Sequence, residues 1–183
     1  MADADAALKT VRARIRTVPD FPKPGISYKD ITPLIEDGAA LHAATDALHA
    51  ATAHFGYDLI LSAEARGFVF GTALAYRSRK GLLLARKPNK LPRETVSATY
   101  DLEYGTDTLE AHTDSVGDGA RVLVCDDLLA TGGTARAMCD LVENAGGTVV
   151  GVAFLIELAY LRGRSRLAPY EVISLVSYAT PDD

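Results

Sequence analysis

VLVCDDLLATGGTARA, residues 122–137, is the stretch that decides the fold. Residues 121–125 have the composition of a strand buried in a sheet, and two aspartates stand at its end. The Gly-Thr loop of residues 130–134 then leads into a helix that we expect over residues 134–145. A buried strand, a glycine loop and a helix in this order predict one unit of an α/β fold, with a mostly parallel sheet covered on both faces.

The rest of the chain repeats this alternation. Apolar spacing predicts helices at residues 4–16 and 39–55, a helix that ends near Arg79, and strands at residues 58–62, 82–85, 148–156 and 171–178. Residues 93–113 alternate weakly and predict a hairpin or flap. Four prolines, Pro19, Pro22, Pro24 and Pro33, exclude regular helix from the loop around them. No linker divides the 183 residues, so we expect a single domain.

Composition excludes several classes of function. With 19 basic and 24 acidic residues, the net charge of −5 disfavours a nucleic-acid binder. No apolar run approaches the 18 or so residues of a membrane span, and the first residues lack the apolar core of a signal peptide. Cys125 and Cys139 form no metal-site or disulfide pattern. We therefore expect a cytoplasmic protein with no nucleic-acid or membrane partner.

The stretch around residues 126–134 suits a phosphorylated sugar. Two glycines let the main chain wrap closely around a phosphate, and amides at the start of a helix donate to it. The carboxylates of Asp126 and Asp127 can accept from adjacent ribose hydroxyls or approach a magnesium ion. The stretch lacks both the Gly-Lys-Ser/Thr of a Walker loop and the G-x-G-x-x-G of a dinucleotide site.

VLVCDDLLATGGT closely resembles the phosphoribosylpyrophosphate-binding motif of type I phosphoribosyltransferases. Four further segments are similar to those of adenine phosphoribosyltransferases, in the same order: FPKPGISYKDITP, ARGFVFGTALA, RKPNKLPRETVSATYDLEYGTDTLEAH and LAPYEV. The resemblance spans roughly residues 10–178. It implies a type I phosphoribosyltransferase fold, a mostly parallel twisted sheet flanked by helices, with a small N-terminal hood at about residues 1–35 and a flexible flap at about residues 92–113.

The resemblance also implies the reaction and the site. The reaction is that of adenine with 5-phosphoribosyl-1-pyrophosphate (PRPP), giving AMP and pyrophosphate in purine salvage. Glu103 corresponds to the general acid/base at the purine, and Tyr104 belongs to the flap. Residues matching the ribose and 5′-phosphate site are Asp126, Asp127, Ala130, Thr131, Gly132, Gly133 and Thr134. Those matching the pyrophosphate site are Arg66, Arg86, Lys87 and Lys90, and those matching the adenine site are Ser27, Tyr28, Lys29 and Leu158.

Magnesium and a second subunit follow from the same resemblance. The Mg²⁺ would be bound mainly through the substrate, without a dedicated protein site. A homodimer would supply some of the basic residues near the pyrophosphate across its interface. The chain departs from the common family pattern at Lys29, Ala65 and Asn89, and Ala65 removes a hydroxyl that often stands near the pyrophosphate.

Two rival hypotheses remain. Transferases for hypoxanthine, guanine or xanthine commonly carry an aspartate where Ala130 stands, so its absence, together with Glu103, favours a 6-aminopurine. A regulator that binds PRPP without catalysis would need a DNA-binding domain, for which about 20 residues before the proline loop are too few. PRPP synthetase shares a similar motif but needs a longer chain with a nucleotide-binding half.

Overall fold

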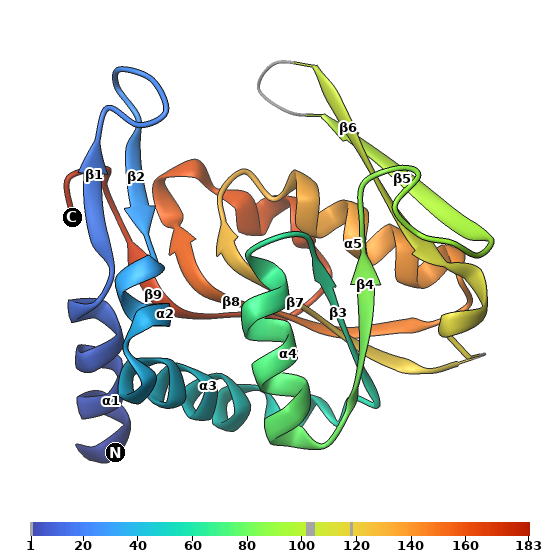
Figure 1. Cartoon of the computed structure of the whole chain (residues 1–183), viewed down its shortest axis with the longest axis horizontal. Helices are drawn as coiled ribbons and strands as arrows, with labels where there is room; N and C mark the ends of the chain where they lie inside the picture. The colour runs from blue at the N-terminus through green and yellow to red at the C-terminus, as the bar shows by residue number, and fades with distance from the viewer. Residues whose placement is uncertain (1, 102–104, 118) are drawn as a thin grey trace.

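The computed structural model describes residues 2–101, 105–117 and 119–183. Five strands form one parallel sheet in the order β4-β3-β7-β8-β9 (Figure 1). They are β3 (Leu59–Ala63), β4 (Gly81–Ala85), β7 (Arg121–Leu129), β8 (Thr148–Leu158) and β9 (Val172–Tyr178). The predicted parallel sheet with flanking helices is confirmed.

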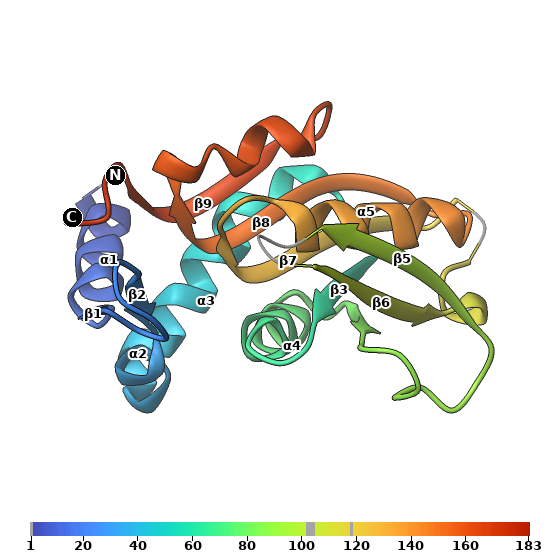
Figure 2. The same cartoon turned by 90° about the horizontal axis from the view of Figure 1, so that it is seen from above.

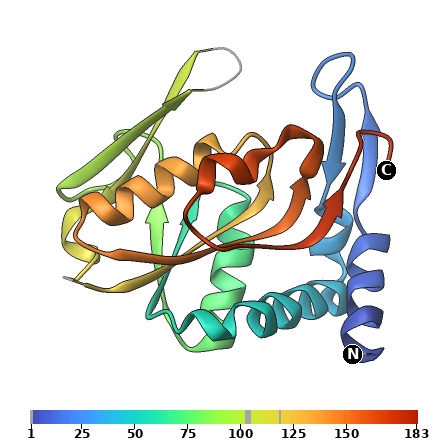
Figure 3. The same cartoon turned by 180° about the vertical axis from the view of Figure 1, so that it is seen from behind.

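Helices cover both faces of this sheet. The longer ones are α1 (Ala2–Ala13), α3 (Gly38–Thr52), α4 (Gly67–Ser78) and α5 (Gly133–Asn144); the short ones are α2 (Thr32–Glu36), η1 (Ala53–Phe55), η2 (Thr113–Ser115), η3 (Ala159–Leu161) and η4 (Gly163–Leu167). Strand side chains alternate between two cores, so that Val124 of β7 packs with α5 while Leu123 packs with α3 and α4. Figure 3 shows α5 on the face opposite α4.

The N-terminal segment stands at one end of the sheet (Figure 2). After α1, the antiparallel pair β1 (Arg16–Pro19) and β2 (Ser27–Asp30) forms a small separate sheet. The prediction that Pro33 excludes helix is wrong, because α2 begins at Thr32. A proline in the first helical turn loses no hydrogen bond, since the amides there have no partner within the helix.

A hairpin of β5 (Thr95–Asp101) and β6 (Thr106–His112) stands at the opposite end of the molecule. This confirms the hairpin expected over residues 93–113. Ala98 and Leu109 face each other across it and join the same core as α5. These two buried side chains therefore attach the hairpin to the core between α5 and the parallel sheet.

The chain reverses its direction of winding between β3 and β7. From β3 it passes through α4 to β4 at the edge, whereas from β7 it passes through α5 to β8 on the other side. Adjacent strand ends at such a switch point leave a crevice for ligands. The β7 strand continues to Leu129, four residues beyond its expected end, because Asp126, Leu128 and Leu129 keep their pairing with β8. No helix within residues 2–101, 105–117 and 119–183 is both long and apolar enough to span a membrane.

Candidate active site

A cavity of about 350 Å³ lies at the switch point, between the ends of β3 and β7. Every residue predicted for the ribose and 5′-phosphate lines it, from Asp126 and Asp127 to Thr134. The loop reaches α5 through Gly132, whose φ of 85° is a left-handed conformation that favours glycine. The first amides of the 12-residue α5 therefore begin at the cavity, which is the arrangement that binds phosphate.

The two aspartates at the end of β7 are buried, at 8% and 6% exposure. Asp126 accepts a hydrogen bond from the Asp127 amide at 2.9 Å. Burial raises the pKa of both carboxyls, and the charge of Asp127 raises that of Asp126 further. Gly67 at the start of α4 leaves the room that Asp126 needs, because a Cβ there would lie 2.4 Å from Asp126 Oδ1. Two adjacent carboxylates are thus held in a dry position where hydrogen-bond donors of a ligand would stabilise their charge.

Arg66 follows β3 and lines two cavities at once. Its Nε lies 2.8 Å from Asp127 Oδ2, and its Nη1 donates to the hydroxyl of Tyr28 in β2. Its guanidinium carbon stands 5.4 Å from the centroid of the Tyr28 ring. Arg66 therefore connects the N-terminal segment with the acid pair, residues that lie far apart in the sequence.

The second cavity, also about 350 Å³, lies between the N-terminal segment and the sheet. Its lining includes all four predicted adenine residues, Ser27, Tyr28, Lys29 and Leu158, and shares Ala130 and Leu128 with the first cavity. Most of the lining is apolar, as is usual for a pocket that takes a flat organic ring. The two cavities share part of their walls, so one ligand can extend from one into the other.

The ammonium of Lys29 is bonded to Thr17 and to the last residues of the chain. Its Nζ donates to Thr17 Oγ1 at 3.0 Å and to the main-chain oxygen of Asp183 at 2.6 Å, and it stands 4.2 Å from the ring centroid of Tyr178. Burial lowers its pKa. The Ser27 hydroxyl donates to the carbonyl of Pro181 at 2.6 Å. Both side chains thus fasten residues 181–183 to the N-terminal segment.

The four predicted pyrophosphate residues separate into two groups. Arg66 and Lys87 line the first cavity, whereas Arg86 and Lys90 line a different one beside β4. Arg86 is held there by Glu64, whose Oε2 lies 2.9 Å from its Nε. In the single chain, the structure therefore does not bring Arg86 and Lys90 to the cavity that Asp126, Asp127 and residues 130–134 line.

Three polar residues at the first cavity were not predicted: Glu64, Tyr100 and Asp107. Glu64 accepts from the Lys87 amide at 2.7 Å, and Asp107 of β6 lies 3.1 Å from Lys87 Nζ. The Tyr100 hydroxyl donates to Asp107 Oδ2 at 3.4 Å. Glu64 follows β3 directly, so the rule that ligands bind at strand ends could have found it. Asp107 and Tyr100 reach the cavity only through the folding of the hairpin.

Glu103 and Tyr104 lie outside the described residues. Within the described residues, no group of three or more His, Cys, Asp or Glu side chains is placed to hold a metal ion.

Comparison with known proteins agrees with this architecture. A protein-family model for the phosphoribosyl transferase domain matches residues 33–180. The adenine phosphoribosyltransferase of Rubrobacter xylanophilus is 65% identical over 178 residues, which are 97% of this chain and 96% of that protein. The one from Symbiobacterium thermophilum is 56% identical over 91% of this chain and 98% of its own length.

Solved structures agree as well. The crystal structure of adenine phosphoribosyltransferase from Thermoanaerobacter pseudethanolicus superposes with a TM-score of 0.91 at 50% identity, covering 93% of this chain and 99% of that one. The enzyme from Saccharomyces cerevisiae, solved in complex with an imino-altritol bisphosphate and adenine, has a TM-score of 0.88 at 32% identity, with the same shares covered. With its type I fold, its loop of residues 130–134 and relatives that match almost end to end, the chain belongs to the adenine phosphoribosyltransferase family.

Proposed function

We propose that the protein joins adenine to the anomeric carbon of PRPP, giving AMP and pyrophosphate. The observation that carries this proposal is the pair of cavities that meet at Arg66: one holds a phosphate loop with two buried acids, the other an apolar slot beside Tyr28. A nucleotide likewise combines a phosphorylated sugar, which would fit the first cavity, with a flat base, which would fit the second. The relatives of highest identity cited above carry the name of this activity.

The sugar half is bound by the loop after β7. In this proposal, the amides and hydroxyls of residues 130–134 hold the 5′-phosphate, and Asp126 and Asp127 accept from the ribose hydroxyls. Arg66 and Lys87 face the charge that develops on the leaving pyrophosphate. Ribose hydroxyls would replace Arg66 as partners of Asp127, which releases the guanidinium toward the pyrophosphate.

The base half is bound between Tyr28 and Leu158. The side chains of Ser27 and Lys29 are engaged elsewhere, so their main-chain groups are the parts left for reading the adenine edge. Ala130 stands where a 6-oxopurine enzyme would carry an acid. The adenine N9–C1′ bond forms while the C1′–oxygen bond breaks, pyrophosphate departs with the bonding electron pair, and Glu103 takes the purine proton. Attack from the face opposite the leaving group inverts the anomeric carbon.

The oxygen-rich lining fits a magnesium ion. Pyrophosphate oxygens would supply most of its ligands, and the carboxylates of Asp126 and Asp127 would be the hard oxygen donors that the cavity offers beside them. When bound with PRPP, the ion neutralises phosphate charge. We propose that it enters with the substrate.

A second copy of the chain completes the proposal. Arg86 and Lys90 line a cavity beside the edge strand β4, together with Leu82, Leu84 and Leu91. Leu84 is 40% exposed on that edge. A homodimer across β4 would cover this apolar surface and bring Arg86 and Lys90 to the partner's pyrophosphate. Sedimentation at micromolar protein tests this step, and a monomer would contradict it. We place the protein in the cytoplasm, in keeping with its two free, buried cysteines.

The test of the reaction is a base-specificity assay. Purified protein, magnesium and PRPP are mixed with adenine, hypoxanthine, guanine or xanthine, and nucleotide formation is followed. AMP from adenine alone is the expected result. Turnover of an oxopurine would overturn the assignment of the base pocket, and PRPP binding without any turnover would favour the regulator.

A further inference from the structure

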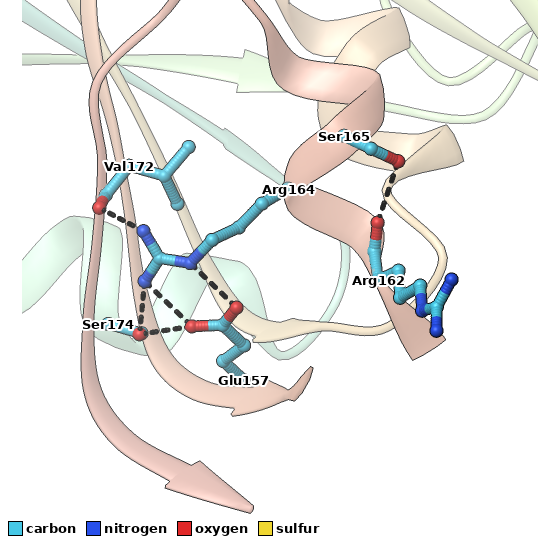
Figure 4. A network of polar contacts seen from close by, with 6 residues as sticks. All are labelled: Glu157, Arg162, Arg164, Ser165, Val172 and Ser174. Carbon is cyan, nitrogen blue, oxygen red and sulfur yellow. Dashed lines mark hydrogen bonds and ion pairs between the residues drawn. The ribbon is translucent and has the colours of Figure 1, made fainter. Parts of the chain in front are cut away.

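An ion pair between the buried Glu157, near the end of β8, and the half-exposed Arg164 of η4 ties these two elements together (Figure 4). Glu157, 6% exposed, receives Arg164 in a two-pronged contact, with Nε–Oε1 and Nη2–Oε2 distances of 2.7 Å each. Ser174 of β9 donates to Glu157 Oε2 at 2.6 Å, and Arg164 Nη1 donates to the Val172 carbonyl at 2.7 Å. The planar guanidinium matches the carboxylate edge, so the geometry of this contact is narrowly defined.

The pair closes residues 157–164 into a loop, one side of which lines the base cavity while the other lies against the loop of residues 130–134. Leu158, Tyr160 and Leu161 form one side and line the base cavity. On the other side, Gly163 touches the phosphate loop: a Cβ on Gly163 would lie 2.3 Å from the Ala130 carbonyl oxygen and 3.1 Å from the Gly132 amide nitrogen.

The contact is equally close from the phosphate loop. A Cβ on Gly132 would lie 2.6 Å from the carbonyl oxygen of Gly163. The two main-chain segments therefore pack closely at Gly132 and Gly163. Any movement of Gly163 would be transmitted to the amides that face the phosphate.

We propose that Glu157 and Arg164 are positioning residues, which set the loop of residues 158–163 against both the base pocket and the phosphate loop. Neither residue lines either cavity. The inference rests on the proposed transfer reaction, because it treats the two cavities as the sites of its two substrates. Only substrate binding should depend on the pair, since the phosphate and base contacts are made alike in the ground state and the transition state.

If the Glu157–Arg164 pair only stabilised the fold, the variants would give a different result. Loss of the pair would then lower the midpoint temperature of unfolding, and the folded enzyme would keep the KM values of wild type. A matched control exists at the other end of β7, where Arg121 donates to the carbonyls of Gly56 and Phe55 at 2.8 and 2.6 Å. Arg121→Met removes a comparable set of guanidinium contacts far from both cavities.

The variants are Arg164→Met, Arg164→Lys and Gly163→Ala. For Arg164→Met we expect KM for PRPP and for adenine to rise roughly tenfold, with kcat within about twofold. Arg164→Lys keeps the positive charge but cannot make the two-pronged contact with Glu157, so its KM values should lie between those of wild type and Arg164→Met. Gly163→Ala presses on Ala130 and Gly132 and should raise KM for PRPP more than KM for adenine.

Wild-type turnover in the same assay separates this inference from the proposed function. If wild type forms no AMP, the function fails, and calorimetric binding of PRPP to the same variants then tests the pair by itself. Weaker PRPP binding in Arg164→Lys and Gly163→Ala, with Arg121→Met like wild type, would support the inference even if Arg164→Met does not fold. A lowered melting midpoint with unchanged KM values, or unchanged PRPP affinity where there is no turnover, would overturn it.

Discussion

The Nε atom of Arg66 lies 2.8 Å from Oδ2 of Asp127. Arg66, proposed to bind the leaving pyrophosphate, is thus paired with Asp127, proposed to bind ribose. The Nη1 atom of Arg66 also donates to the hydroxyl of Tyr28, in the proposed base pocket. Arg66, itself assigned to the pyrophosphate, therefore contacts one residue from each of the other two parts of the site.

Arg66→Met should impair the use of both substrates. Loss of the guanidinium removes charge stabilisation of the leaving group, and we expect kcat/KM to fall roughly 10²-fold or more. Arg77→Met, in helix α4, which begins directly after Arg66, breaks an exposed pair with Asp46 and serves as control. Steady-state kinetics with each substrate varied in turn measure the effect. An Arg66→Met enzyme within a few-fold of wild type would remove Arg66 from the site.

Glu103→Ala should lower kcat by roughly 10²–10⁴, the usual range for loss of a general acid/base. The control is Glu94→Ala, an exposed acid just before β5. Single-turnover rates with saturating substrates give the chemical step. Unchanged turnover would exclude Glu103 from proton transfer.

Asp126→Asn together with Asp127→Asn should raise KM for PRPP, because amides replace the carboxylate acceptors offered to the ribose hydroxyls. KM for adenine should change less, since neither acid lines the base cavity. Initial rates at varied PRPP test this, and an unaltered KM for PRPP would contradict the ribose assignment.

The buried acids also predict a pH effect on stability in the absence of ligand. Burial raises the pKa of Asp126 above its ordinary value of 3.8, so the folded state holds this proton more tightly than the unfolded state. Stability is then lost as pH rises from 3.8 through the folded pKa. Asp126→Asn should therefore be more stable than wild type at neutral pH, and the difference should shrink toward pH 4. Denaturant titrations of both proteins across this pH range measure the difference in their stability. A difference that does not change with pH would contradict the raised pKa of Asp126.

Asp107→Asn should tighten pyrophosphate binding. Asp107 holds Lys87 at 3.1 Å and places a negative charge in the cavity proposed for an anion. Lys87 is largely exposed, so the gain should be small, roughly two- to fivefold in Kd. This gain in pyrophosphate affinity should also become smaller as salt is added. Calorimetry with magnesium pyrophosphate tests this, and weaker binding by the variant would show that Asp107 assists the ligand.

The sequence alone was enough for the fold class and for most of the residues that line the first cavity. Buried strands alternate with helices over short stretches, so local pattern predicted all five sheet strands to within a few residues. The placement of residues 126–134 at this cavity was predictable because they are contiguous, and a strand followed by a glycine turn and a helix determines where they lie. The resemblance added the base-pocket residues, all four of which line one cavity.

Only the tertiary structure decided how distant side chains meet. Tyr28, Arg66 and Asp127 come from three elements, and no local pattern states that they touch. Arg86 and Lys87 are neighbours in the chain, yet they line different cavities because successive side chains of an extended segment point to opposite sides. The same holds for Arg164 and Glu157, whose contact depends on how η4 folds back over β8 and β9. Local sequence sets backbone conformation through short-range sterics and periodicity, whereas side-chain partners depend on packing between segments that the chain brings together only once it is folded.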